Sequence, residues 1–275
     1  MGTTLYKNAD WIITMNEKRE KIRHGDLLIS GKEILDVGTD LEKKYEGTLK
    51  IDHVVEAEGT VILPGFVNVH HHTWQSLIRN IQATRGLKLE PWLTVMYEIY
   101  KDLNTDVARA GVYSGLGDML KTGCTTSNDL WYPHPVGVKY LVDAEIEAAA
   151  EIGIRFHPTR GFHSVPSSIV PPEVVDTKES VVEDTIRLVK KYHDRSRFSM
   201  CQVGIAPSIA QYETEDIIEA VVDLAEEYDI MVHGHLAESQ HEVEYTLKTW
   251  GCRPFEWFKR HRLLGKRFYF AHCIH

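Results

Sequence analysis

Residues 64–76, PGFVNVHHHTWQS, place three histidines in a row after a short apolar run that begins at a Pro-Gly turn. The run FVNVH (66–70) has the length and composition of a buried strand. Side chains alternate between the two faces of a strand, so His70 and His72 are predicted to point one way and His71 the other. Two neutral imidazoles side by side are suited to chelate a divalent ion, with a third ligand from another strand end.

The pattern of the chain changes at this stretch. Residues 4–63 alternate short β-like runs with Gly and charged turns and have no helical apolar period, which predicts a small β module. After Pro64 and Gly65 the pattern becomes strand, loop and helix, repeated, as in βαβ units around a parallel sheet. We therefore divide the chain into residues 1–63 and residues 64–275.

Five more strands are expected after the first, with helices between them. Capping signals predict a helix over residues 105–122, with Thr105 as the N-cap and Gly123 beyond its end, and a second over residues 138–152, before Gly153. A further helix is expected over residues 254–260. Apolar stripes mark two more helices, one by Val182, Ile186 and Val189 and the other by Ile217, Val221 and Leu224. The expected strands are 124–129, 154–160, 200–208, 230–235 and 267–272. Six strands with intervening helices fit a doubly wound sheet or a TIM barrel.

The positions of polar residues favour the barrel. Candidate functional side chains fall at the C-terminal ends of the strands: His70 with His72, Asp129, Arg160, His235 and His272. A TIM barrel gathers such groups into one ring, so the expected α/β fold is a (β/α)8 barrel. Because only six of eight strands are found, we expect a barrel truncated after strand six, with unpaired first and last strands.

Three further assignments concern the chemistry. His235, which ends an almost continuous apolar strand, is expected to be the third metal ligand. Glu238 lies near enough to take a proton from a metal-bound water and return it to the substrate, although an acidic residue is also favoured in the first turn of the next helix. His272 is expected to orient the attacking water or stabilise developing charge, with a hydrogen-bonded core histidine as the alternative.

Three side chains are candidates for holding a substrate. The Gln75 amide can pair with a ring carbonyl and N–H, and Trp92 can stack on a flat heteroaromatic ring, although aromatic residues in barrel loops often only pack. Arg160 is expected to hold a carbonyl or an anionic tautomer, with a surface ion pair as the alternative. His71 and His163 are interpreted as structural.

The overall composition restricts the partners. The formal net charge of −9 provides no basic field for phosphates, so neither nucleic acid nor a membrane is expected as a partner. No stretch approaches the roughly 18 apolar residues of a membrane span, and the N-terminus has no signal-peptide pattern. The four cysteines form no CxxC pair, so no thiolate zinc site is indicated. We expect a cytoplasmic protein with a small, neutral or weakly charged ligand.

Three motifs, PGFVNVHHH, HGHLAES and FAHCIH, together resemble the amidohydrolase superfamily, in the branch of cytosine and guanine deaminases and triazine hydrolases. HHHTWQSLIR, PWLTVMYEIY, GCTTSND and RFHPTRG are most similar to 8-oxoguanine deaminases and hydroxytriazine aminohydrolases. The resemblance implies that residues 1–63 form the N-terminal part of a small β-sandwich. It implies that residues 64–275 form strands one to six of a metal-dependent hydrolase barrel.

The resemblance also implies a set of site residues. One divalent metal, with zinc favoured over iron, would be held by an aspartate from strand eight and by three histidines, His70, His72 and His235. Acid and base roles fall to Glu238 and His272, and His275 becomes a pocket residue. The strand-eight aspartate is absent, so we expect a complementary C-terminal segment to supply it.

The reaction that the resemblance implies is hydrolytic deamination of an exocyclic amine on a purine-like or triazine-like ring, as in 8-oxoguanine and guanine deaminases. One alternative is a triazine chlorohydrolase or N-alkylaminohydrolase on the same scaffold. An alternative of another class is a catalytically incomplete binding or assembly subunit. The expected partners are a small heteroaromatic substrate, further copies of the chain in a homo-oligomer, and the complementary segment.

Overall fold

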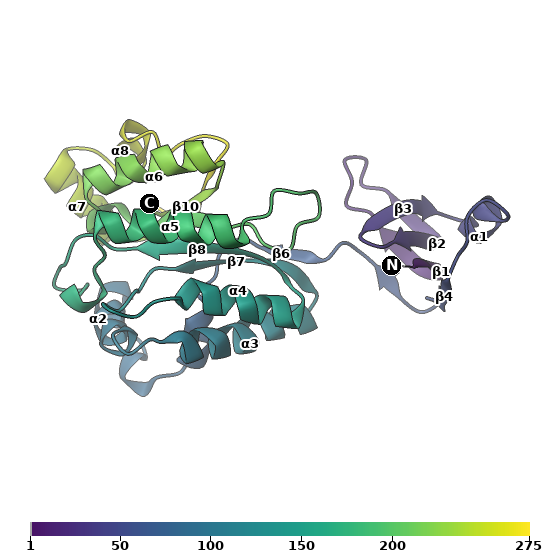
Figure 1. The fold of residues 1–275 in the computed structure, drawn as a ribbon, viewed down its shortest axis with the longest axis horizontal. Helices are drawn as coiled ribbons and strands as arrows, with labels where there is room; N and C mark the ends of the chain where they lie inside the picture. The colour runs from purple at the N-terminus through teal and green to yellow at the C-terminus, as the bar shows by residue number, and fades with distance from the viewer. Residues whose placement is uncertain (1) are drawn as a thin grey trace. The chain divides into compact units, whose positions relative to one another are not determined.

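The structure, a computed structural model, describes residues 2–275 and separates into two compact units (Figure 1). The first unit ends at Phe66, and the second comprises Val67–His275. The boundary falls a little after the division expected at residue 63.

The first unit is a five-stranded sheet. Its strands are β1 (Thr3–Ile13), β2 (Lys21–Ser30), β3 (Glu33–Gly38), β4 (His53–Glu56) and β5 (Val61–Ile62). β2 pairs antiparallel with β1 and β3, whereas β4 and β5 run parallel to β1. The β character expected for this part of the chain is therefore confirmed.

A short helix in this unit, α1 (Leu41–Tyr45), has no signal in the sequence pattern. The buried carboxylate of Asp26 accounts for it, because one oxygen accepts the backbone N–H of Leu41 at 2.9 Å and the other accepts that of Asn8 at 2.9 Å. Leu41 then packs with Leu5 and Leu28 in a small core. A tertiary hydrogen bond satisfies an N–H at the helix start that no residue of the helix can satisfy.

The second unit contains a six-stranded curled sheet in the order β11-β10-β9-β8-β7-β6 (Figure 1). The strands are β6 (Phe66–Asn68), β7 (Cys124–Trp131), β8 (Arg155–Phe162), β9 (Gly204–Pro207), β10 (Val232–Leu236) and β11 (Phe268–His272). Neighbours from β7 to β11 pair in parallel. The strand order follows the chain order without the reversal of a doubly wound sheet, so the sheet is a segment of a barrel.

The helices of this unit connect the strands. They are α2 (Leu89–Tyr100), α3 (Thr105–Lys121), α4 (Leu141–Ile152), α5 (Lys178–Tyr192), α6 (Glu215–Tyr228), α7 (Gln240–Trp250) and α8 (Pro254–Arg260). Figure 1 shows α3 beside α4 and α5 beside α6. The helices expected from sequence, α3 to α6 and α8, are confirmed, whereas α2 and α7 are additional. Within residues 2–275, no helix combines the length and apolar composition needed to cross a bilayer.

The start of α3 corrects one expectation. Asn104, not Thr105, is the N-cap, since its side-chain oxygen accepts the N–H groups of Asp106 and Val107 at 3.0 and 3.1 Å. Thr105 is the first helical residue. Asn is the stronger capping residue of the two, because its side-chain oxygen reaches the orphan N–H groups of the first turn more favourably.

The apolar stripe expected for α5 is confirmed at Val189, which is buried, but not at its other two positions. Val181 and Leu188 are fully buried, whereas Val182 and Ile186 are only partly buried and pack at the margin of the core. The Val221 stripe of α6 is buried as expected. In both helices the buried face is wider than a single i, i+4, i+7 row, as is typical of a helix packed on a sheet.

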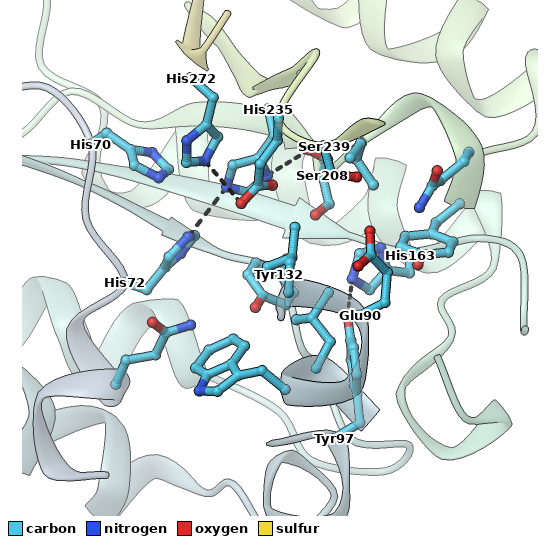
Figure 2. A pocket seen from close by; sticks show the side chains of 18 residues that line it. His70, His72, Glu90, Tyr97, Tyr132, His163, Ser208, His235, Ser239 and His272 are labelled. Carbon is cyan, nitrogen blue, oxygen red and sulfur yellow. Dashed lines mark hydrogen bonds and ion pairs between the residues drawn. The ribbon is translucent and has the colours of Figure 1, made fainter. Parts of the chain in front are cut away.

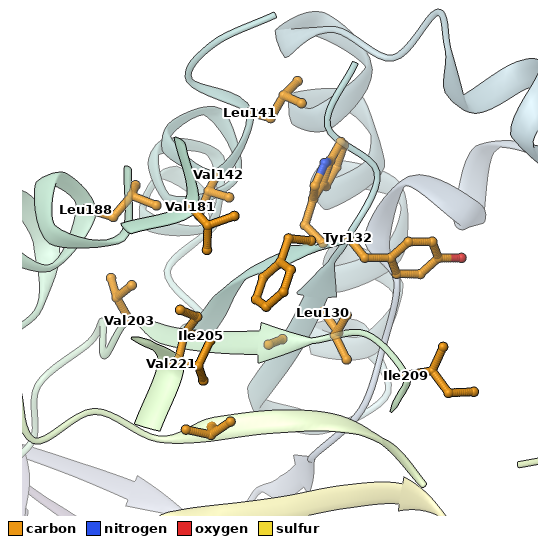
Figure 3. Packing of buried hydrophobic residues seen from close by; sticks show 14 of the residues in the cluster. Leu130, Tyr132, Leu141, Val142, Val181, Leu188, Val203, Ile205, Ile209 and Val221 are labelled. Atoms are coloured by element: carbon orange, nitrogen blue, oxygen red, sulfur yellow. The ribbon is translucent and has the colours of Figure 1, made fainter. Parts of the chain in front are cut away.

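The core of the second unit lies between the strands and these helices (Figure 3). Leu130 on β7, Ile205 on β9 and Val221 on α6 are almost completely excluded from solvent. Close packing of this kind holds the ends of the strands in fixed positions, and the candidate site is built at those ends.

Candidate active site

His70 and His72 lie on an extended segment just beyond β6, which ends at Asn68. The strand is therefore shorter than the expected run of residues 66–70. The alternation of side chains nevertheless continues past it: His70 and His72 face the cavity, whereas the Nδ1 of His71 lies 4.0 Å from Asp129 Oδ1. Asp129 is completely buried and accepts the backbone N–H of Thr73, which anchors the segment after the histidines.

His235 on β10 joins these two rings. One ring nitrogen from each of His70, His72 and His235 lies within 4.8 Å of the others, and Figure 2 shows the three rings gathered at one end of the cavity. Burial keeps the rings neutral: it lowers the pKa of His70 to about 3 and moves the pKa values of His72 and His235 well below the usual range. The strand ends therefore bring together three neutral imidazoles.

The hydrogen bonds of two rings show which nitrogen is available for a metal. The Nδ1 of His72 donates to the Leu130 carbonyl at 2.7 Å, and the Nδ1 of His235 donates to the Ser208 carbonyl at 2.7 Å. A carbonyl only accepts, so both Nε2 atoms carry lone pairs. These Nε2 atoms face one another at 3.2 Å. A cation between them would offset the repulsion of the two lone pairs, and two ligands of a tetrahedral zinc ion are about 3.3 Å apart. The donor set fits a divalent metal.

Glu238 and His272 lie beside this cluster. Glu238 Oε1 is 3.4 Å from His272 Nε2, and the His272 ring stacks on the His235 ring with centroids 5.3 Å apart. Burial, together with the negative charges of Glu242 and Glu90, raises the pKa of Glu238 to about 7. A carboxyl group with this pKa can take up and release a proton near neutral pH.

The alternative role considered for Glu238, an acid in the first helical turn, belongs to Glu242 instead. Helix α7 begins at Gln240 with Ser239 as its N-cap, so Glu238 precedes the helix. Glu242 lies in the first turn and accepts the backbone N–H of Glu238 at 2.9 Å. The Glu238 side chain is thereby left free to line the cavity.

The cavity measures about 240 Å³ and contains most of the predicted site residues. The residues that line it include Gln75 and Trp92 as well as His70, His72, His235, Glu238 and His272. The amide nitrogen of Gln75 donates to the Tyr100 hydroxyl at 3.0 Å, which orients the amide. The opposite end is polar as well, since Tyr97 and His163 are hydrogen bonded there (Figure 2).

Two predicted pocket residues lie elsewhere. The buried guanidinium of Arg160 donates twice to Asp176, at 2.8 and 3.1 Å, and once to Asp184 at 2.9 Å, so it is neither a surface ion pair nor a lining residue of this cavity. Those carboxylates draw the side chain to the side of β8 away from the site. His275 is exposed and does not line the cavity; its backbone N–H donates to the Ala237 carbonyl at 3.1 Å. These placements correct the expectations for Arg160 and His275.

Two histidines near His70, His72 and His235 were not predicted as site residues from the sequence. His233 Nε2 lies 2.8 Å from His70 Nδ1, and the HGH run of residues 233–235 repeats the HxH spacing of His70 and His72, which was the available signal. His163, interpreted as structural, lines the cavity, with its Nδ1 3.5 Å from the buried Glu213. Nothing in the local sequence signals that contact, because it joins residues 50 positions apart.

Residues 61–275 match the model of the Amidohydrolase family, and the chain belongs to this family. The resemblance seen in the motifs is thus confirmed. The chain is 31% identical over 223 residues to the 8-oxoguanine deaminase of Pseudomonas aeruginosa, covering 80% of this chain and 50% of that protein. It is 28% identical to the hydroxydechloroatrazine ethylaminohydrolase of Pseudomonas sp. strain ADP, covering 99% of this chain and 58% of that one. The chain therefore spans about half the length of these relatives.

A similar solved structure is the atrazine chlorohydrolase of Arthrobacter aurescens complexed with zinc. It superposes with a TM-score of 0.91 at 25% sequence identity, over 99% of this chain and 61% of that one. The similarity extends over both units and agrees with the barrel segment described above.

Proposed function

We propose that the protein is a metal-dependent hydrolase that removes an exocyclic amine from a purine-like or triazine-like ring. The observation that carries this proposal is the meeting of three neutral imidazoles with a carboxyl group whose pKa is about 7. The deaminase and aminohydrolase names of the relatives support the same class of reaction.

His70, His72 and His235 would hold one divalent metal, with zinc favoured by the zinc-bound neighbour and iron as the alternative. When bound, such an ion lowers the pKa of a coordinated water so that it becomes a nucleophile near neutral pH. The protein's part is to keep the three rings neutral and turned toward one point, which their burial and hydrogen bonds support.

Glu238 would move the protons. Its carboxylate takes a proton from the attacking water, and its protonated form returns that proton to the departing nitrogen, which must leave as ammonia because an amide anion is a poor leaving group. A pKa near 7 suits both steps. His272, 3.4 Å away, would hold the Glu238 carboxylate and stabilise charge that develops on the ring.

The substrate would be a small flat ring. The cavity of about 240 Å³ is below the roughly 300–1,000 Å³ of pockets for drug-sized ligands. Gln75 uses one amide N–H on Tyr100, so its amide oxygen remains free to accept an N–H from the ring. Trp92 lines the same cavity and would stack on the ring face.

We further propose that a C-terminal segment completes the site with the strand-eight aspartate. Two observations support this: β6 and β11 each have a single strand neighbour within residues 2–275, and Val67 on β6 and Val69 just after it are exposed. The homo-oligomeric state stays a prediction.

Dechlorination is the second candidate, favoured by the similarity to atrazine chlorohydrolase. Chloride leaves without a proton, so its release would depend less on Glu238 as an acid than ammonia release does. A binding or assembly subunit is the candidate of another class, and it predicts no turnover with any of these substrates.

The test is a panel of oxidised purines, pterins, aminotriazines and chlorotriazines, assayed for ammonia and chloride. The chain is assayed alone and with the C-terminal segment supplied. Ammonia release that disappears in the His235→Ala variant supports the proposal. Chloride release alone would favour the second candidate, and no turnover by the completed, zinc-loaded protein would refute both.

A further inference from the structure

We propose that His233 sets the tautomer of His70 and so acts as a positioning residue for the candidate metal centre. This inference rests on the proposed function, because it concerns the same three rings. It adds a fourth histidine, which binds no metal itself but decides whether His70 can do so.

His70 differs from the other two rings in its partner. His72 and His235 donate through Nδ1 to backbone carbonyls, which fixes their tautomers whatever side chains surround them. The Nδ1 of His70 instead faces the Nε2 of His233 at 2.8 Å. An imidazole nitrogen can donate or accept, so the tautomer of His70 depends on the tautomer of His233.

A backbone carbonyl fixes the tautomer of His233. Its Nδ1 lies 3.0 Å from the Tyr269 carbonyl, which can only accept, so the proton is on Nδ1. The ring is 1% exposed, and the hydrogen bonds found for it within residues 2–275 reach that carbonyl and His70, not a carboxylate. An imidazole that carries its one proton on Nδ1 accepts at Nε2. The Nε2 of His233 is therefore an acceptor.

It follows that the proton between the two rings belongs to His70. With Nδ1 donating to His233, the Nε2 of His70 carries a lone pair, as do the Nε2 atoms of His72 and His235. Without an acceptor at His233, His70 is free to adopt the other tautomer, which places a proton on Nε2 and removes the lone pair.

The packing of His233 limits its rotation. Its ring is stacked on that of Tyr269, with centroids 4.2 Å apart and an interplanar angle of 11°. The Tyr269 hydroxyl is held in turn by Asn128 at 2.9 Å and His157 at 3.1 Å. Asn128 and His157 thus hold Tyr269, and Tyr269 packs on His233, which bonds His70.

The experiment combines a spectroscopic and a binding readout on the 275-residue chain. In metal-free wild type, nitrogen NMR of labelled histidine should show His70 protonated at Nδ1 and unprotonated at Nε2. Zinc affinity, measured by competition with a chromophoric chelator, should fall about 10- to 100-fold in His233→Leu, the loss typical for a partner of a metal-bound histidine. His233→Gln keeps an acceptor and should stay within a few-fold of wild type.

His134→Leu is the matched control, since it removes a buried histidine that bonds the Trp131 carbonyl and does not line the site cavity. It should leave zinc affinity unchanged, and thermal unfolding verifies that each variant folds. A His70 protonated at Nε2, or a His233→Leu chain that binds zinc as tightly as wild type, overturns the inference while the proposed function stands. If wild type binds no zinc even with the C-terminal segment supplied, the proposed function fails and the NMR measurement alone decides the inference.

Discussion

Replacing Glu238 by Gln should have opposite effects on activity and stability. The Glu238 side chain is 22% exposed, and its pKa is raised from 4.5 to about 7 by burial and by the charges of Glu242 and Glu90. Each pKa unit corresponds to about 1.4 kcal/mol, so ionising this group in the folded protein costs about 3 kcal/mol. Gln fills the same space without the charge but carries no exchangeable acid proton.

The direction of the stability change follows from proton linkage. Between pH 4.5 and 7 the unfolded chain loses the Glu238 proton while the folded chain keeps it, so the free energy of unfolding falls as pH rises. Above pH 7 both states are ionised and the full cost is present. Metal-free Glu238→Gln should therefore be more stable than wild type by up to about 3 kcal/mol at pH 8 and no more stable at pH 4.5.

Activity should move the other way. Loss of the proton shuttle lowers kcat for ammonia release about 10²- to 10⁴-fold. Urea unfolding at the two pH values and steady-state ammonia assays measure the two effects. Glu244→Gln, on the exposed side of α7, is the control and should change neither quantity. A Glu238→Gln variant with wild-type kcat, or one that is less stable than wild type at pH 8, would refute the reasoning.

Three further predictions concern the residues around the site. Arg160→Met removes the ion-pair partner of the buried Asp176, whereas Asp184 keeps its ion pair with Arg187. The substitution should lower the free energy of unfolding in urea by about 3–5 kcal/mol, with kcat per folded molecule unchanged; a large loss of kcat would indicate that Arg160 belongs to the site. Gln75→Leu removes a hydrogen bond worth about 0.5–1.5 kcal/mol and should raise KM about 2- to 10-fold at constant kcat, so an unchanged KM would exclude Gln75 from binding. Asn104→Ala should lower the free energy of unfolding by about 1 kcal/mol and Thr105→Ala by less, and the reverse order would contradict the assignment of Asn104 as the N-cap.

Strand order and the meeting of His70, His72 and His235 could be predicted because each depends on a local periodic pattern. Side-chain alternation along residues 66–72 separates His70 and His72 from His71 even though β6 ends at Asn68. The extended backbone simply continues past the last ladder hydrogen bond. The ends of parallel strands then meet by topology, so His235 needed no further information to be placed.

The features that the sequence did not predict depend on contacts between residues far apart in the chain. Arg160 ends up between two carboxylates that come from the loop before α5 and from α5 itself, and no local pattern reveals them. Helix α1 begins because Asp26 accepts the N–H of Leu41. The role of His233 emerges only once the direction of its bond to the Tyr269 carbonyl is known.

X-ray absorption at the zinc edge tests the central claim most directly. For the zinc-loaded chain we predict one zinc ion per molecule with three imidazole nitrogens at about 2.0–2.1 Å, falling to two in His72→Ala and in His235→Ala. A wild-type spectrum with fewer than three imidazoles, or one that neither substitution changes, would contradict the convergence of His70, His72 and His235 on a single ion.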